Sequence, residues 1–405
     1  MLESTQIILS SPTWSLNGVN IFSAQLVRGL RQRGLRARIL LTHPHAPDSK
    51  PMPAPTDALI EHLPIGPWAG WRTRWRVVTR YLEEHAPCIY LPNYDFYHAS
   101  IIPLLSDNVS VVGILHSDDE QYYEHARRMG RYWNAAVAVS SVIAQKTLAA
   151  TPALAPRLTT IPYGVSIPQS PPKNRNTSAF LRILYAGRLE QSQKRILDLP
   201  DIMAALHART VPATLTIAGD GPARKTLQQA CIAHDLPASS VRYLGVLPHK
   251  KVLRLFEQHD VFILPSAYEG LPLALLEAMS RGCVPVVSDV PSGVSELIEH
   301  GVNGFRAPVG RVQVFADLLE RLYKSPARRN AMAQNAYRRI REGNFTLEKM
   351  ISHYLELFQH IEKERGSHTF HRSPGEIQPP PSFSWREHIP MPLRRVYQKT
   401  TRPGQ

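Results

Sequence analysis

The sequence has 405 residues, 43% of them hydrophobic, enough for two domains of ordinary size with filled cores. Its formal net charge of +14 suits acidic partners such as nucleotide phosphates, nucleic acid or an anionic membrane surface. Three scattered cysteines argue against a disulfide framework or a zinc-binding cysteine cluster, and no run reaches the ~18 apolar residues of a membrane-spanning helix. We expect a cytoplasmic protein, soluble or peripheral at the inner face of the cell membrane.

Short β-rich runs alternate with helical patterns along the whole chain. The runs are residues 6–11, 38–42, 89–91, 109–115 and 135–140 in the first half, and 183–186, 213–218, 241–244, 261–264 and 284–288 in the second. Continuous Val, Ile and Leu runs separated by helices are typical of a parallel sheet that is covered on both faces. The sequence therefore predicts an α/β protein with two doubly wound, Rossmann-like domains.

Composition places the domain boundaries. Residues 1–168 form the predicted amino-terminal domain, and the polar, proline-rich residues 169–178 have the composition of an exposed linker. Residues 179–345 form the predicted second domain, and an apolar periodicity predicts a helix over 346–365. Residues 366–405 are basic and proline-rich, so we expect a mobile tail.

An aromatic stripe in the first domain leaves two interpretations open. Apolar side chains recur on one helical face, and arginines occupy the other; the apolar set is Trp68, Trp71, Trp75, Val78 and Leu82, and the basic set is Arg72, Arg76 and Arg80. This pattern is standard for a helix packed on a sheet, which is the favoured interpretation. It also fits a helix lying at a membrane interface.

Glycines and basic residues follow several of the predicted strands. The glycines are Gly18, Gly187, Gly219, Gly221 and Gly245, and each marks a turn where loops of an open α/β sheet meet ligands. Arg188 and Lys194 directly follow the 183–186 strand and could neutralise two phosphates without a metal. The alternatives are ordinary turn glycines and an exposed helix start.

The segment 260–279 combines a strand, a turn and a helix. The apolar strand ends at Pro265, the turn carries Glu269 and Gly270, and a helix begins near Pro272. Glu269 thus follows a strand's carboxyl end, and Glu277 lies two turns into the helix, where it could accept hydrogen bonds from a vicinal diol. The amides of Leu271, Leu273 and Ala274 would favour an anionic ligand. A surface loop carboxylate and a solvated helix position are the alternatives.

Together these motifs resemble those of family 4 glycosyltransferases of the GT-B fold, in the glycosyltransferase group 1 family. The main motif is Ser-Ala-Tyr-Glu-Gly-Leu-Pro-Leu-Ala-Leu-Leu-Glu-Ala at 266–278. Supporting motifs are Gly-Arg-Leu at 187–189 with Gln-Lys-Arg at 193–195, Ala-Gly-Asp-Gly-Pro at 218–222, Leu-Gly-Val-Leu-Pro at 244–248 and Ile-Pro-Tyr-Gly-Val at 161–165. The resemblance is strong over 182–303 and thinner over the first 165 residues.

The resemblance implies roles for individual donor-site residues. Glu269 would contact hydroxyls of the transferred sugar, Glu277 the ribose diol, and Arg188 with Lys194 the pyrophosphate, while Gly18 would let backbone amides approach it. The rest of the implied donor site consists of Gly245, Val246 and Leu247 against the base, with Gly270, Leu271, Pro272 and Leu273 in the turn. Many relatives have two adjacent glycines where this chain has Asn17 and Gly18.

The resemblance also implies a reaction. His116 matches an amino-domain histidine that touches the donor sugar near the reacting carbon, and it forms the catalytic set with Glu269. Two domains would face one cleft and transfer a hexose-type sugar from a UDP-, GDP- or ADP-sugar to a glycan or lipid-linked acceptor, with retention of configuration. No metal and no cofactor are expected, and a phosphate oxygen would take the acceptor proton. Bacterial surface polysaccharide or glycolipid synthesis is the implied setting, and no nucleic acid partner is expected.

Other functions remain open from sequence alone. A nucleotide-sugar epimerase of the same fold would need an acid/base pair that is not apparent, and a non-catalytic nucleotide-sugar binder fits the diffuse positive charge. A glycoside hydrolase could use Glu269 and Glu277 as its carboxylate pair, but the basic residues argue against it. A dinucleotide dehydrogenase is disfavoured because no GxGxxG motif opens a helix after a strand.

Overall fold

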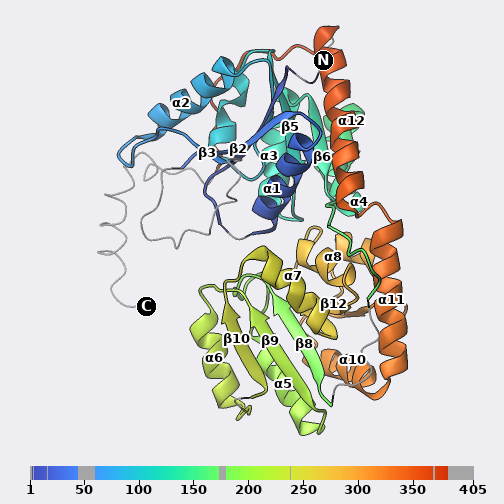
Figure 1. The fold of residues 1–405 in the computed structure, drawn as a ribbon. Helices are drawn as coiled ribbons and strands as arrows, with labels where there is room; N and C mark the ends of the chain where they lie inside the picture. The colour runs from blue at the N-terminus through green and yellow to red at the C-terminus, as the bar shows by residue number, and fades with distance from the viewer. Residues whose placement is uncertain are drawn as a thin grey trace. The chain divides into compact units, whose positions relative to one another are not determined.

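The chain folds into two compact units, each built on one parallel sheet (Figure 1). The computed structural model describes residues 2, 4–15, 17–43, 60–172, 179–237, 239–367 and 370–381. The first unit takes the described residues up to Ile161 and those from Ile351 onward, and the second spans Pro162–Met350. The chain therefore returns to the first unit after completing the second. Residues 173–178 of the predicted linker and 382–405 of the predicted tail lie outside the described residues.

The first unit contains a seven-stranded sheet in the order β3-β2-β1-β4-β5-β6-β7, with every pair parallel. Its strands are β1 (Gln6–Ser11), β2 (Arg36–Leu41), β3 (Ile60–His62), β4 (Cys88–Leu91), β5 (Val109–Leu115), β6 (Ala135–Ala138) and β7 (Leu158–Thr160). The strand order reverses between β1 and β4. At such a switch point the loops at the carboxyl edge diverge, which is where open α/β sheets bind ligands.

Helices flank this sheet (Figure 1). They are α1 (Gly18–Arg31), α2 (Trp71–Glu84), α3 (Glu120–Met129) and α4 (Ser141–Ala150), with the short 3₁₀ helices η1 (His98–Leu104), η2 (Gly130–Tyr132) and η3 (Pro152–Arg157). The chain re-enters the unit along α12 (Leu347–Gly366). A Cβ on Gly29 of α1 would lie 2.0 Å from Ile351 Cδ1, so the absence of a side chain at Gly29 lets α12 pack closely.

The second unit contains a six-stranded sheet in the order β10-β9-β8-β11-β12-β13, again with every pair parallel. Its strands are β8 (Leu181–Ala186), β9 (Ala213–Ala218), β10 (Val241–Gly245), β11 (Val261–Leu264), β12 (Val284–Ser288) and β13 (Phe305–Ala307). Its helices are α5 (Asp198–Ala208), α6 (Arg224–Ala233), α7 (His249–Gln258), α8 (Leu273–Met279), α9 (Gly293–Leu297), α10 (Val312–Lys324) and α11 (Pro326–Glu342). Its order reverses between β8 and β11.

The two sheets confirm the predicted fold class of two doubly wound domains. All ten predicted strands are present, and β1, β5, β9, β11 and β12 have the predicted bounds. Every residue of β4, β5, β6, β11 and β12 is buried, which explains their continuous apolar sequences. The edge strands β3, β7 and β13 were not predicted.

The aromatic stripe belongs mainly to the core. Trp71 and Trp75 of α2 are 3% and 6% exposed, and Val78 and Leu82 are fully buried. Trp68 precedes the helix and is 61% exposed, and the three arginines of the opposite face are also exposed. The core interpretation is therefore confirmed for α2, and Trp68 lies outside it. None of the helices in the described ranges is both long and apolar enough to cross a bilayer.

The predicted mobile tail needs a correction over residues 370–381, which pack on the first unit. The Arg372 guanidinium is buried and donates hydrogen bonds of 2.9–3.2 Å to main-chain carbonyls from two segments that are separate in the sequence. These acceptors are the carbonyls of Leu105, Ser106, Val109 and Tyr132. Composition alone predicts a mobile segment here, because it does not reveal that the Arg372 side chain reaches buried main-chain carbonyls.

Candidate functional site

The loops that follow β8, β9 and β10 are joined by main-chain hydrogen bonds at the carboxyl edge of the second sheet. Gly187 N donates to Ala218 O at 3.0 Å, and Gly219 N donates to Gly245 O at 2.8 Å. Gly219 has a φ of +142°, and a Cβ there would lie 1.9 Å from Gly187 O. Likewise, a Cβ on Gly221 would lie 2.3 Å from Leu189 O. Close backbone approach therefore requires glycine at 219 and 221.

Glu269 lies in the loop between β11 and α8 and is only 5% exposed. Its Oε1 lies 2.6 Å from Nζ of Lys194, which follows β8 and is itself 18% exposed. Ala267 N also donates to Gln193 O at 2.7 Å, which ties the two loops together. The structure thus brings together a carboxylate predicted to bind the sugar and an ammonium predicted to bind phosphate, and Glu269 is not a solvated surface residue.

Glu277 is buried on α8 and has a partner that sequence analysis missed. His249, the first residue of α7, donates from Nε2 to Glu277 Oε1 at 2.5 Å. His249 follows the Gly245–Leu247 loop, so the segment predicted to lie against the base also orients the carboxylate predicted to bind the ribose. Its place directly after Leu-Gly-Val-Leu-Pro was the one signal available in the sequence.

The second residue predicted to bind phosphate, Arg188, has its side chain in solvent. Arg188 is 63% exposed, and its guanidinium lies 3.7 Å from Glu190 Oε2. Only the Arg188 main chain is held firmly, because its carbonyl accepts a 2.7 Å hydrogen bond from the Tyr185 hydroxyl. The structure therefore pairs Lys194 with Glu269 but leaves the Arg188 side chain beside Glu190.

The turn before α8 is buried and held in place. Gly270 O accepts a 2.9 Å hydrogen bond from Gly293 N, and a Cβ on Gly293 would lie 2.6 Å from Leu271 Cδ1. The helix begins at Leu273 with Pro272 as its N-cap, one residue later than proline at the first helical position would give. Within the described residues, the amides of Leu271 and Leu273 have no hydrogen-bond acceptor.

The loop after β10 offers an apolar surface. Gly245 has a φ of +65°, and a Cβ added there would meet nothing within 4 Å. The backbone conformation alone therefore explains why glycine occupies this position. Val246 is 54% exposed, which is unusual for a valine beside a sheet edge, and Leu247 is half-buried. A planar base could pack against such a surface.

His116 and Gly18 belong to the first unit. His116 follows β5, is 5% exposed, and has Nε2 3.2 Å from Asn93 Oδ1. Burial lowers the His116 pKa to about 3, so the imidazole is neutral at physiological pH. Gly18 is the exposed first residue of α1, and Asn17 caps that helix by accepting from Asn20 N.

A polar network fixes the loops around Gly18, and sequence analysis did not find it. Ser11 Oγ donates to Asn20 Oδ1 at 2.8 Å, and the Tyr94 hydroxyl donates to the same oxygen at 3.2 Å. Asn17 Nδ2 in turn donates to the Tyr94 hydroxyl at 3.3 Å. These contacts join the loops after β1 and β4 at the switch point of the first sheet.

Comparisons with known proteins find sequence likeness mainly in the second unit. Residues 167–339 match the family model of "Glycosyl transferases group 1". The α-D-kanosaminyltransferase of Streptomyces kanamyceticus is 35% identical over 154 residues, which is 38% of this chain and 39% of that protein. The lipopolysaccharide 1,6-galactosyltransferase of Salmonella typhimurium is 33% identical over 154 residues, or 38% and 42% of the two chains. The matched segment thus spans about two fifths of each relative.

A solved structure extends the likeness to most of the chain. Anabaena HepE in complex with UDP and glucose aligns with a TM-score of 0.70 at 18% identity, over 88% of this chain and 100% of that one. At this identity the likeness concerns the fold alone. Together with the two parallel sheets, it shows that the chain has the GT-B fold.

Proposed function

We propose that this chain, whose residues 167–339 match the model of the group 1 glycosyltransferases, transfers a hexose-type sugar from a nucleoside diphosphate donor to a glycan or lipid-linked acceptor, with retention of configuration. The observation that carries the proposal is the pair of buried carboxylates on one loop and helix. Glu269 is held by Lys194, and Glu277 is held by His249. Buried carboxylates with charged or hydrogen-bonding partners at the carboxyl edge of a sheet are typical of a binding site.

The two carboxylates suit two different groups of one ligand. Glu277 accepts from His249 through Oε1, which leaves Oε2 to accept from a ribose hydroxyl. Similarly, Glu269 Oε1 accepts from Lys194 Nζ, and Oε2 would accept hydrogen bonds from hydroxyls of the sugar. The amides of Leu271 and Leu273, in the turn between the two carboxylates, would donate to phosphate oxygens of that ligand.

We propose that the diphosphate is bound without a metal. The Lys194 ammonium has three donors, so it can keep Glu269 and still donate to a phosphate oxygen. The exposed Arg188 side chain is separated from Glu190 by 3.7 Å, a weak contact that a phosphate would readily replace. Two cations then balance the diphosphate charge as the leaving group departs.

Retention follows if the acceptor attacks from the side of the leaving group. A phosphate oxygen of the donor would take the acceptor proton. His116 cannot serve as an acid at physiological pH, because its buried imidazole is neutral. Its part would be to hydrogen-bond the donor sugar near the reacting carbon.

The proposal also covers the base of the donor nucleotide and the class of acceptor. A UDP-sugar is the first candidate among UDP-, GDP- and ADP-sugars, because the HepE structure of the same fold holds UDP and glucose. The lipopolysaccharide galactosyltransferase supports an acceptor in bacterial surface polysaccharide or glycolipid synthesis. We further propose that the protein works in the cytoplasm in peripheral contact with the anionic inner face of the membrane, which its +14 charge favours.

The first test is thermal stabilisation by a panel of UDP-, GDP- and ADP-sugars. At about 100 times Kd a ligand adds about 2.7 kcal/mol, which raises the Tm of a unit of this size by several degrees. One nucleotide series should give the shift, and Glu277→Ala and Arg188→Ala should reduce it. Glu342→Ala, at an exposed end of α11, is the matched control and should leave the shift unchanged.

Transfer is tested with the donor that binds. Incubation with candidate glycan and lipid-linked acceptors should release the nucleoside diphosphate, and the anomeric configuration of the product should match that of the donor. Binding without release of nucleotide would point instead to a non-catalytic nucleotide-sugar binder. Absence of any donor shift would overturn the site assignment.

A further inference from the structure

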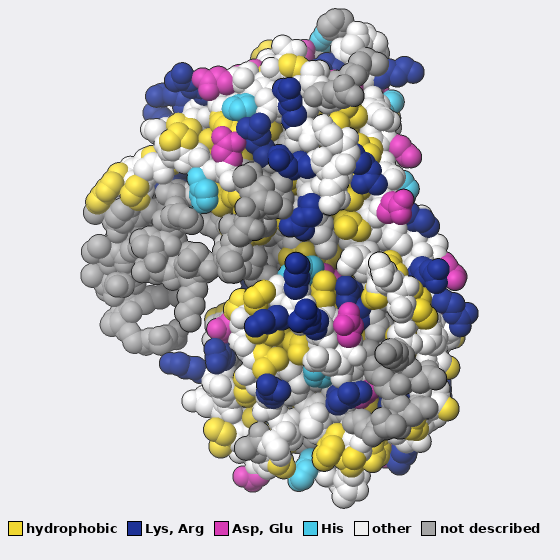
Figure 2. Space-filling model, in the orientation of Figure 1, with side chains coloured by type: hydrophobic (Ala, Val, Ile, Leu, Met, Phe, Trp, Pro, Cys, Tyr) yellow, Lys and Arg dark blue, Asp and Glu magenta, His cyan; other side chains and the backbone are white. Residues whose placement is uncertain are grey.

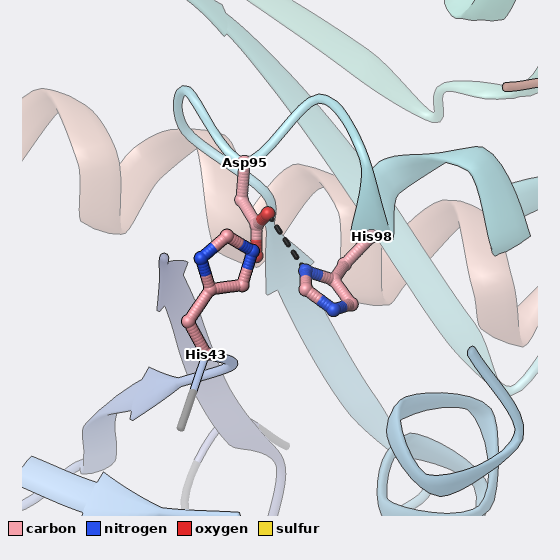
Figure 3. A group of neighbouring side chains, drawn as sticks. All are labelled: His43, Asp95 and His98. Carbon is pink, nitrogen blue, oxygen red and sulfur yellow. Dashed lines mark hydrogen bonds and ion pairs between the residues drawn. The ribbon is translucent and has the colours of Figure 1, made fainter. Parts of the chain in front are cut away.

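A second cluster of polar side chains lies at the carboxyl edge of the first sheet. His43 comes shortly after β2, Asp95 lies in the loop after β4, and His98 is the first residue of η1. Figure 3 shows the two imidazoles converging on the Asp95 carboxylate from separate segments. One nitrogen or oxygen of each side chain lies within 4.8 Å of those of the other two.

The spacing of these atoms suits a shared metal ion. His98 Nδ1 lies 2.9 Å from Asp95 Oδ1. Metal bonds of about 2.0–2.2 Å place neighbouring ligand atoms roughly 3 Å apart, so the same spacing fits two ligands of one ion. Thr42 Oγ1 donates to Asp95 Oδ2 at 2.6 Å, which fixes the carboxylate with its other oxygen towards His98. Ligating carboxylates usually have such an outer hydrogen bond.

The surroundings leave the carboxylate in need of positive charge. Asp95 and His98 are 1% and 0% exposed. The centroid of the Trp71 ring lies 5.2 Å from that of the His98 ring and 5.7 Å from that of the His43 ring. A buried ionised carboxylate is costly unless a cation accompanies it. In the described part of the chain, His98 is the only group that forms an ion pair with Asp95. A proton on an imidazole or a metal ion must therefore supply the charge.

The hydrogen bond between Asp95 and His98 leaves part of the imidazole unpaired. His98 Nε2 is buried and has no hydrogen-bond partner among the described residues. A buried ring nitrogen without a partner is costly, so hydrogen bonding within the described residues does not by itself account for the burial of this imidazole.

We propose that His43, Asp95 and His98 bind one Zn²⁺ ion, which fastens the loop after β2 to the loop after β4. Two imidazoles and one carboxylate suit a divalent transition metal such as Zn²⁺, whereas Mg²⁺ and Ca²⁺ prefer oxygen ligands. The ion is structural, and none of its three ligands is a residue assigned to the diphosphate.

The site also has a consequence for the first sheet. Asn93, which hydrogen-bonds His116, lies two residues before Asp95 on the same loop. Fixing Asp95 would therefore restrain the segment that orients His116. This inference does not rest on the proposed transfer reaction, because metal binding can be measured without donor or acceptor.

The test uses the untagged full-length protein after treatment with a chelator. Equilibrium dialysis against Zn²⁺, read by elemental analysis, should give one tightly bound ion per chain, and Zn²⁺ but not Mg²⁺ should raise the Tm. His98→Gln and His43→Gln should each weaken Zn²⁺ binding at least tenfold. Thr42→Val keeps the shape of the side chain but removes the hydrogen bond to Asp95, so it should weaken binding by roughly 10–100-fold.

The matched control is His125→Gln, at a buried histidine of the same unit that is not in the cluster. It should bind Zn²⁺ as the unaltered protein does. Failure of the unaltered protein to bind Zn²⁺ more tightly than the His98→Gln variant would overturn the proposal, as would equal loss in the control. Because His43 is only half-buried, its variant keeps the test decisive if His98→Gln fails to fold.

Discussion

If Glu277 binds the donor ribose as proposed, its hydrogen bond from His249 should make donor affinity depend on a residue outside the carboxylate motif. Leaving a buried carboxylate without its donor costs about 1–3 kcal/mol. His249→Leu should therefore raise the donor Kd by roughly tenfold or more, with a smaller effect on kcat, because the ribose is bound equally in the ground and transition states. Calorimetric titration and steady-state kinetics with the bound donor would measure the two effects.

The controls separate positioning from folding. His249→Asn keeps a side-chain N–H donor and should recover part of the affinity. His234→Asn alters an exposed histidine of the same unit, paired with Asp201, and should leave the donor Kd unchanged. Unchanged affinity in His249→Leu would show that Glu277 does not need this partner.

The buried His116 predicts a pH dependence of stability. Its pKa is about 3 in the folded protein, whereas an unfolded histidine titrates near 6.5. As the pH falls below about 6.5, the unfolded chain takes up a proton that the folded chain does not, so stability falls by up to about 1.4 kcal/mol per pH unit. The loss should level off near the folded pKa.

Urea unfolding at about pH 7 and about pH 5 would measure this slope. His116→Gln removes one titrating group and leaves the buried His125, whose pKa burial also lowers to about 3, so the stability of the variant should change less between the two pH values than that of the unaltered protein, but should still change. His360→Gln, at a solvent-exposed histidine of α12, should keep the full slope. An equal slope in all three proteins would mean that His116 is already accessible to protons.

At the residue scale, the sequence predicts several residues of the candidate site but not their hydrogen-bond and ion-pair partners. Glu269 and Glu277 follow a strand in a recognisable pattern, so the sequence locates them. Lys194 and His249 reach them from other loops, after β8 and β10. Those contacts depend on the strand order β10-β9-β8-β11, which no local pattern encodes. The predicted association of Arg188 with the phosphates remains a prediction.

At the scale of elements, burial decides which strands are predictable. Central strands are buried on both faces and carry unbroken apolar runs, as β5 and β11 do. The edge strands β3, β7 and β13 have three residues each and are partly exposed. Three residues are too few for a periodicity, so pairing with a neighbouring strand decides their conformation.

The segment 370–381 is an element that a single residue anchors. Burial lowers the Arg372 pKa to about 10, and the carbonyls around the guanidinium replace the lost water. Arg372→Lys keeps the charge, but an ammonium has three donors without the planar fork. We expect a loss of about 2 kcal/mol in the free energy of unfolding and faster proteolysis within 370–381.

The matched control lies on the same segment. Glu376 is exposed, so Glu376→Ala should change neither the Tm nor the rate of proteolysis. Equal protease resistance in the Arg372→Lys variant would show that apolar contacts, rather than the arginine, hold the segment on the first unit.

At the scale of the whole molecule, positive charge is distributed rather than concentrated. Lys and Arg exceed Asp and Glu by 47 to 33, and Figure 2 shows the dark blue side chains scattered over the visible face. A diffuse excess gives weak attraction to any anionic surface. Specific contact with a membrane needs an apolar residue beside the charges, which Trp68 provides in the described residues before α2.

Membrane contact through this region predicts a composition-dependent association with lipid. Each arginine near an anionic surface contributes about 1 kcal/mol, so the protein should sediment with vesicles containing phosphatidylglycerol and remain in solution with neutral vesicles. Trp68→Ser with Arg72→Glu should lower the bound fraction several-fold at low salt. Arg338→Glu changes the charge at an exposed position of α11 in the other unit and should lower the bound fraction far less. Equal recovery with and without anionic lipid would contradict the membrane proposal, and an equal loss in both variants would assign the association to net charge rather than to the region around Trp68.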